Sequence, residues 1–208
     1  GTKTETHLYR GAAWQRVSTT SAGVTTSYVY DGDNVIADMI GGNVAKNYVT
    51  PFLDQNLSMT NSSGTYYYSQ DGLGSVRTLT DATGTIKNTY DYTAYGEKFA
   101  PNTTETITNR YQYTGREKNA VSGLQYNRFR YYSSDLGRWS SRDPAGYPNN
   151  LQGNLYEYVG GGVTVGVDQM GLGDHDTLPE AILIPDDAET LNSALKRAAR
   201  LSKGGATT

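Results

Sequence analysis

The residues that decide the fold of this chain are 124–172, LQYNRFRYYSSDLGRWSSRDPAGYPNNLQGNLYEYVGGGVTVGVDQMGL. Two Asp-x-x-Gly sequences lie in this stretch, one beginning at Asp143 and one at Asp168. Each has the residue order of a tight turn, and Pro144 strengthens that pattern in the first. The residues before the stretch are repetitive and those after it differ in composition, so the stretch marks a boundary in the chain.

The first part of the stretch predicts a β-hairpin. Alternation over Leu124–Tyr132 indicates one strand, with Phe129 and Tyr131 on one face. Four side chains would share the other face: Tyr126, Arg128, Arg130 and Tyr132. Ser134–Gly137 then predicts a turn, and Arg138–Ser140 the partner strand. Proline at 144 prevents that strand from continuing.

A tyrosine-centred unit recurs about every 20 residues in the first half of the chain. Its instances are Tyr28–Gly32, Tyr48, Tyr66–Tyr68 and Tyr90–Tyr92. Gly-, Asn- and Asp-rich turns separate them, and the residues beside these turns alternate between apolar and polar. Such alternation around turns predicts β-hairpins, and the regular spacing favours an array over an ordinary β-sandwich.

Composition agrees with an all-β protein. Tyrosine (18) far outnumbers phenylalanine (3), and glycine is frequent (24). The net charge of −3 predicts no nucleic-acid partner, and the absence of a long apolar run predicts no membrane span. No signal peptide is expected at the polar N-terminus. With no cysteine, disulfides, thiolate catalysis and cysteine-bound zinc are excluded.

The sequence resembles the Rhs/YD-repeat family. The resemblance rests on Tyr30-Asp31, Asp71–Gly96 and Tyr113–Tyr147, and covers roughly residues 25–172. Its motifs occur in order: Arg-Tyr-Tyr, Gly-Arg-Trp, Arg-Asp-Pro-x-Gly, Asn-Leu-Tyr-x-Tyr-Val and Asp-x-x-Gly-Leu. The later part resembles the C-terminal Rhs core of polymorphic-toxin Rhs proteins and of the Tc toxin C component.

This resemblance implies a fold and a domain order. Antiparallel hairpins would form part of a spiralling YD-repeat shell that encloses a C-terminal effector, in an exported protein that is secreted or held at the cell surface. Three segments are expected: a hairpin array in 1–110, the Rhs core in 111–172 and a tail or effector start in 173–208. The partners implied are the chain's own C-terminal region and the upstream shell.

Two aspartates and an arginine are the candidate catalytic residues. If two carboxyl groups meet, repulsion keeps one of them protonated, so one can act as an acid and the other as a base. Such a pair could hydrolyse a peptide bond with no metal or other cofactor. The only histidines are His7 and His175, which poorly supply a serine or cysteine mechanism.

The resemblance assigns the same roles to particular positions. It places the catalytic groups at Asp143, Asp168 and Arg130, and the self-cleaved bond between Leu172 and Gly173. The reaction would be that of a single-turnover aspartic self-cleaving peptidase. Two departures from the family pattern lie nearby: Gln169 replaces proline, and Gly160–Gly166, which begins with three adjacent glycines, replaces an Asn-Asn-Pro turn.

Two alternatives stay open. Either aspartate, taken alone, fits the first position of a turn and needs no catalytic role. The whole chain could also be a non-catalytic secreted or cell-surface module whose tyrosine-rich strands bind carbohydrate or a partner cell.

The C-terminal tail has a different pattern, and its residues predict a helix over about 188–203. Asp174–Asp176 is a weak candidate for a metal site.

Overall fold

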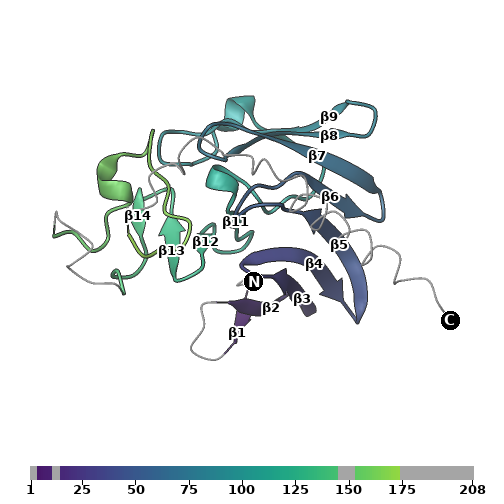
Figure 1. Cartoon of the computed structure of the whole chain (residues 1–208), viewed down its shortest axis with the longest axis horizontal. Helices are drawn as coiled ribbons and strands as arrows, with labels where there is room; N and C mark the ends of the chain where they lie inside the picture. The colour runs from purple at the N-terminus through teal and green to yellow at the C-terminus, as the bar shows by residue number, and fades with distance from the viewer. Residues whose placement is uncertain (1–3, 11–14, 145–152, 174–208) are drawn as a thin grey trace, which may run out of the picture. The chain divides into compact units, whose positions relative to one another are not determined.

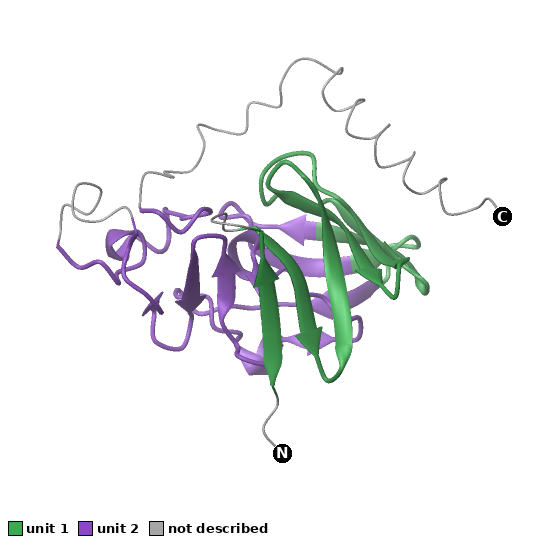
Figure 2. Ribbon diagram, turned by 90° about the horizontal axis from the view of Figure 1, so that it is seen from below, with its two compact units in different colours: residues 1–68, 80–85, 183–208 green, residues 69–79, 86–182 purple. Residues whose placement is uncertain are grey.

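The computed structural model describes residues 4–10, 15–144 and 153–173, and nearly all of their regular structure is antiparallel β (Figure 1). The predicted all-β class is therefore confirmed. The chain divides into two compact units, coloured separately in Figure 2. Among the described residues, unit 1 holds those up to Tyr68 and Thr80–Thr85, and unit 2 holds Ser69–Leu79 and Ile86 onward.

Unit 1 is a run of hairpins in which each strand pairs with the next one along the chain. Its strands are β1 (Glu5–Tyr9), β2 (Arg16–Ser21), β3 (Val24–Asp31), β4 (Asn34–Ile40), β5 (Asn43–Val49), β6 (Ser58–Asn61) and β7 (Gly64–Gln70), whose last two residues belong to unit 2. The turns fall at the predicted glycines; Gly41 and Gly42 both adopt positive φ, as a two-residue hairpin loop requires.

The buried hydrophobic side chains of unit 1 come from strands β4 to β7: Val35, Ala37, Tyr48, Met59 and Tyr66. The Tyr48 hydroxyl donates to Asp38 Oδ2 at 2.8 Å, so this tyrosine brings a polar contact into the buried layer. That pairing meets the requirement for a partner that a buried phenol imposes.

Unit 2 contains two groups of strands. The first is β8 (Val76–Asp81, with its last two residues in unit 1), β9 (Ile86–Thr89) and β10 (Thr104–Glu105). The second is a four-stranded sheet in chain order: β11 (Glu117–Lys118), β12 (Gln125–Asn127), β13 (Arg130–Ser133) and β14 (Arg138–Trp139). In the part of this unit that the structure describes, three short 3-10 turns accompany them: η1 (Ala100–Asn102), η2 (Tyr113–Gly115) and η4 (Val159–Gly161).

The predicted single strand over Leu124–Tyr132 is wrong. It is a hairpin, because the chain turns at Arg128 and Phe129 and pairs Tyr126 with Tyr131. Arg128 adopts φ of +59°, a left-handed conformation that is unusual for arginine. Neither Gly nor Pro occurs in this turn, and Asn127 stands before its two central residues. The predicted return of Arg138 and Trp139 beside β13 is confirmed.

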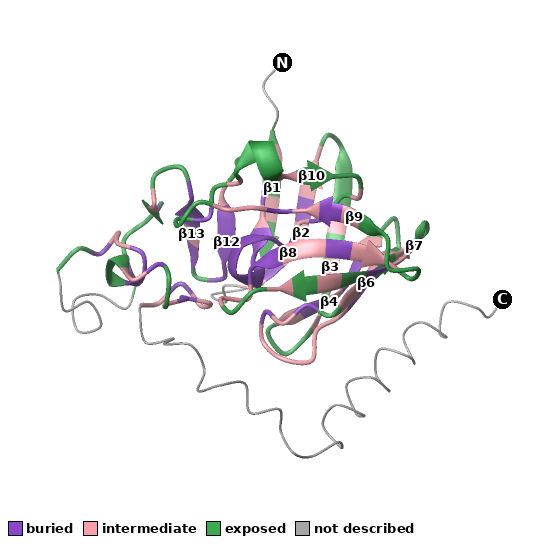
Figure 3. Ribbon diagram, turned by 90° about the horizontal axis from the view of Figure 1, so that it is seen from above, coloured by how far each residue is buried: buried purple, intermediate pink, exposed green. Residues whose placement is uncertain are grey.

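An aromatic cluster forms the core beside this sheet, and Figure 3 shows β12 and β13 largely in the buried colour. Tyr132, Trp139 and Tyr158 meet in pairs, with ring centroids 4.3–5.6 Å apart. Tyr113, Val159 and Val163 complete the cluster. Burial raises the pKa of Tyr158 well above its ordinary value, so its phenol stays neutral.

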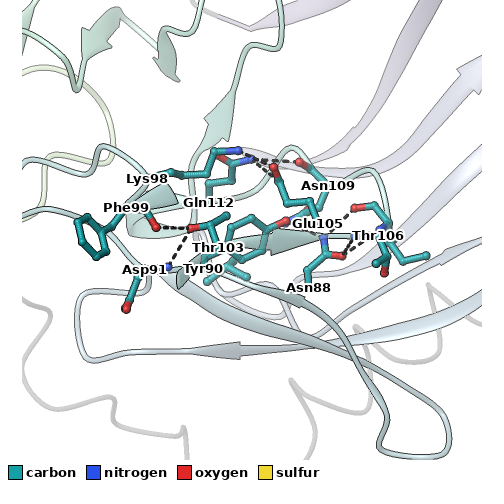
Figure 4. A network of polar contacts seen from close by, with 12 residues as sticks. Asn88, Tyr90, Asp91, Lys98, Phe99, Thr103, Glu105, Thr106, Asn109 and Gln112 are labelled. Atoms are coloured by element: carbon teal, nitrogen blue, oxygen red, sulfur yellow. Dashed lines mark hydrogen bonds and ion pairs between the residues drawn. The ribbon is translucent and has the colours of Figure 1, made fainter. Parts of the chain in front are cut away.

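A network of side-chain hydrogen bonds connects β9 to the residues that follow β10 (Figure 4). Asn88 is fully buried, and its Oδ1 accepts hydrogen bonds from the Thr106 and Ile107 amides, each at 2.9 Å. Its Nδ2 donates to the Tyr90 hydroxyl and to the Ile107 carbonyl, each at 2.7 Å. One side chain thus replaces several ladder bonds of a strand pair.

The expected boundaries at residues 110 and 172 stay predictions. The expected tail helix and Asp174–Asp176 lie outside the described residues. None of the helical segments in the described ranges has the length and apolarity needed to cross a bilayer.

Candidate functional site

The β12–β13 hairpin places Arg130 in the interior of unit 2. Arg130 begins β13, pairs with Asn127 across the hairpin and is 3% exposed. Its guanidinium lies against the ring of Trp139, with the Cζ atom 4.1 Å from the ring centroid. An arginine so deeply buried needs compensating partners, because desolvating an unpaired cation is very unfavourable.

Both predicted aspartates supply those partners. Arg130 Nη2 lies 2.9 Å from Asp143 Oδ2 and 3.0 Å from Asp168 Oδ2, and all three side chains are 2% exposed. The three residues predicted from sequence therefore meet, with the two carboxyl groups on a single guanidinium nitrogen. Arg130 also donates through Nε to the Gly171 carbonyl at 2.7 Å and through Nη1 to the Leu155 carbonyl at 3.3 Å.

Burial shifts two of the titratable groups. It lowers the pKa of Arg130, and the charges of Asp168 and Asp143 oppose that shift. Burial likewise raises the pKa of Asp168, against hydrogen bonds from the Gly173, Leu172 and Gly171 amides and the charge of Arg130. Raised pKa values of buried carboxyl groups favour the protonated form, which a general acid requires.

Asp168 is also a turn residue, as the alternative interpretation predicted. Its Oδ1 accepts from the amides of Gly171 at 2.6 Å and Leu172 at 3.1 Å. Asp71 and Asp81 make comparable turns, each with Oδ1 accepting from the amides two and four residues later. Asp168 differs from both because its side chain is buried. Asp71 also meets an arginine, Arg77, but at 3.9 Å and between partly exposed side chains.

One further contact of Asp168 sets it apart. Its Oδ2 accepts a hydrogen bond from the Gly173 amide at 3.0 Å. The nitrogen of the predicted scissile bond therefore touches the same oxygen that contacts Arg130. The turn geometry and a catalytic role are compatible, since the turn brings the carboxyl group to this bond.

Asp143 reaches the site from the segment after β14. Its amide donates to the Leu155 carbonyl at 3.0 Å, and the same carbonyl accepts from Arg130. The rest of its predicted Asp-Pro-x-Gly turn, Ala145 and Gly146, lies outside the described residues. The Gly160–Gly162 run forms a hydrogen-bonded turn, with Gly160 and Gly161 at positive φ.

Sequence reasoning missed several residues that build the site. Asn127 is fully buried and donates to the Asp168 carbonyl at 2.6 Å. Arg128 donates to the Gln169 carbonyl at 2.7 Å, and the Phe129 amide to the Met170 carbonyl at 3.0 Å. The signal in the sequence is the group of three polar residues, Asn127, Arg128 and Arg130, between Tyr126 and Tyr131.

Comparisons with known proteins bear on this site. No family model matches the chain. The tRNA3(Ser)-specific nuclease WapA of Bacillus spizizenii is 32% identical over 162 residues, which is 75% of this chain and 7% of WapA. Toxin subunit YenC1 of Yersinia entomophaga is 40% identical over 96 residues, 44% of this chain and 10% of YenC1. A double-stranded DNA deaminase toxin of Burkholderia cenocepacia is 31% identical over 97 residues, 45% of this chain and 7% of that toxin.

The chain is homologous to segments of these toxin proteins, which is consistent with its resemblance to the Rhs/YD-repeat family. It spans only 7% of the length of the WapA proteins that it matches. The fold agrees with the resemblance: the TcdB2–TccC3–TEV crystal structure superimposes with a TM-score of 0.63 over 81% of this chain and 9% of the other, at 22% identity. A Tc holotoxin pore of Photorhabdus luminescens superimposes over 89% of this chain and 9% of the other, with a TM-score of 0.63 at 21% identity.

Proposed function

We propose that this segment is the C-terminal core of an Rhs-type toxin protein, which closes an encapsulating β-shell and cuts its own backbone between Leu172 and Gly173. The observation that carries the proposal is the contact of Asp168 Oδ2 with the Gly173 amide, while Asp143 shares the same arginine nitrogen. The carboxyl pair and the bond are thereby held in one place.

The proposed reaction is the hydrolysis of one peptide bond. Ionised Asp143, held by Arg130, takes a proton from water, and the water oxygen attacks the Leu172 carbonyl carbon. As that carbon becomes tetrahedral, the lone pair of the Gly173 nitrogen is no longer delocalised into the carbonyl group and can accept a proton. Protonated Asp168 gives its proton to this nitrogen, and the carbon–nitrogen bond breaks to leave a Leu172 carboxyl and a Gly173 amine. The raised pKa of Asp168 and its contact with Gly173 support this division of roles.

The substrate is part of the same chain, so the reaction is a single turnover. Folding delivers the bond to the carboxyl groups at high effective concentration, and slow chemistry can suffice. The partners in this proposal are the C-terminal region that the cut releases and the upstream YD-repeat shell. The toxin names of the relatives support an exported protein, secreted or at the cell surface.

The test is the intact mass of freshly folded chain. Wild type should give two pieces, residues 1–172 and 173–208, whereas Asp143→Asn and Asp168→Asn should stay whole. Asparagine keeps the shape and much of the turn hydrogen bonding but cannot exchange a proton in the same way. Asp81→Asn is the matched control, because it changes a turn aspartate of similar geometry outside the site. This variant should still be cut between Leu172 and Gly173.

Circular dichroism of each variant should match wild type, which separates loss of chemistry from loss of fold. A wild-type chain that stays one full-length species under every condition in which it folds would defeat the proposal. The segment would then be a structural YD-repeat module.

A further inference from the structure

Residues 127–130 form hydrogen bonds to the backbone carbonyl groups of residues 168–171. Four consecutive residues of the β12–β13 hairpin donate to four consecutive carbonyl oxygens, in matching order. The bonds are Asn127 Nδ2 to Asp168 O (2.6 Å), Arg128 Nη1 to Gln169 O (2.7 Å), Phe129 N to Met170 O (3.0 Å) and Arg130 Nε to Gly171 O (2.7 Å). We call residues 127–130 the carbonyl clamp.

The clamp is rigidly built. Gln125 Nε2 donates to Asn127 Oδ1 at 3.0 Å, so the amino group of Asn127 is the one that faces Asp168. Asn127, Arg128 and Arg130 are at most 4% exposed. Buried side chains with fixed partners keep their donors in place, which is what a preorganised binding site needs.

Gly171 is the position where the clamp excludes a side chain. A Cβ there would lie 2.6 Å from the Asn127 carbonyl oxygen and 3.0 Å from the Arg130 amide nitrogen. Its φ of +74° is also unfavourable for residues other than glycine. The contacts at Gln169 and Met170 are made to carbonyl oxygens, a group that every residue has.

We propose that the carbonyl clamp is a peptide-binding site that recognises the main chain of residues 168–171, requires glycine at 171 and so determines which bond is cut. The second half of this statement rests on the function proposed above. When the clamp holds the carbonyl groups of residues 168–171, the Asp168 carboxyl group lies against the amide of Gly173, two residues after Gly171. The cut is therefore set by position along the backbone, and side chains at 169 and 170 are not what selects it.

The binding half is tested by hydrogen exchange of the Phe129 amide, measured by NMR in an Asp143→Asn background that keeps the chain whole. Arg128→Asn removes the guanidinium, while asparagine still tolerates the left-handed backbone at this position. We expect the Phe129 amide to exchange about tenfold faster or more, the factor for losing one charge-assisted hydrogen bond.

Gly171→Ala should accelerate the same amide at least as much. Its matched control is Gly123→Ala, because Gly123 has nearly the same φ, +72°, but nothing within 4 Å of the added Cβ. Faster exchange in Gly171→Ala alone would support the clamp. Unchanged Phe129 exchange in both Gly171→Ala and Arg128→Asn would overturn it.

The selection half is tested by mapping the cut in chains that retain Asp143. Met170→Ala should be cut at the same peptide bond, whereas Gly171→Ala should lose the cut. A cut that moves in Met170→Ala, while Phe129 stays protected, would show that the clamp binds but does not select. If wild type itself stays whole, the proposed function fails, and the exchange measurements still decide whether the clamp exists.

Discussion

The Oδ2 atom of Asp168 accepts a hydrogen bond from the Gly173 amide at 3.0 Å. A carboxyl group thus touches the nitrogen atom that must become an amine if the chain is cut after Leu172. The same oxygen lies 3.0 Å from Arg130 Nη2 in the buried interior. A change in the protonation state of Asp168 therefore affects its contacts with both Gly173 and Arg130.

The rate of the cut should fall as the pH rises through the pKa of Asp168. Burial raises that pKa, so the protonated acid persists to higher pH than for an exposed aspartate and is then lost. Chain purified whole in urea and refolded across a pH series would give the rate from its mass over time. A rate that climbs steadily with pH would rule out Asp168 as the acid.

The stability of unit 2 should depend on pH through the same group. A carboxyl whose folded pKa lies above its unfolded value of about 3.8 stabilises the fold fully below that pH. This contribution disappears as the pH rises through the folded pKa. The Tm of Asp168→Asn should therefore rise relative to wild type as the pH increases above about 4.

Asp81→Asn provides the comparison for that measurement, because it alters a partly exposed turn carboxyl away from the site. If the Tm difference between Asp168→Asn and wild type does not change over about five pH units, from about pH 3 to about pH 8, the raised pKa of Asp168 is contradicted.

Replacing Arg130 should be strongly destabilising. Arg130→Met leaves Asp143 and Asp168 buried without their shared cation, a loss of about 3–5 kcal/mol in the free energy of unfolding. Arg130→Lys should lose less, because it keeps the charge but not the planar set of donors to Gly171 and Leu155. Urea unfolding gives both values.

Acid should shrink the effect of Arg130→Met, since burial raises the pKa of Asp168 and its carboxyl group then becomes neutral. Equal destabilisation by methionine and lysine would instead mean that Arg130 acts by its shape and not by its charge.

The Asn88 side chain should matter as much as a core residue. Asn88→Ala leaves the Thr106 and Ile107 amides without their acceptor and should destabilise unit 2 by about 1–3 kcal/mol. Asn102→Ala removes one exposed bond to Asp91, which water can replace, and should change stability by less than about 0.5 kcal/mol. Similar values for the two variants in urea unfolding would refute this ranking.

Much of the fold could be predicted from the sequence, because hairpins are local. The turn glycines near Gly41 and the alternation beside them report directly on neighbouring strands, and those pairings are present. The hairpin at Arg128 was missed because its left-handed residue carries a Cβ and gives no local turn signal. Its conformation depends on bonds to residues about forty positions away, which no local pattern contains.

Some residues of the candidate site could likewise be predicted from the sequence, and others could not. Arg130, Asp143 and Asp168 could be chosen because ordered motifs contain them, and the structure brings them together. Their catalytic role stays a prediction. Asn127 and Gln125 could not be chosen, because an amide in a strand gives no indication of which distant carbonyl it will meet.

The pairing of each strand in unit 1 with its successor has a consequence for the order of events during synthesis. Such neighbours can join as soon as both have left the ribosome, because the intervening loops are short. The contact between Asn127 and Asp168 joins residues 41 positions apart, and Arg130 waits for the same late segment. A chain whose synthesis stops before Asp168 can therefore pair the strands of unit 1 but has no assembled carboxyl pair, so the proposed cut could occur only after residues 168–173 have been made.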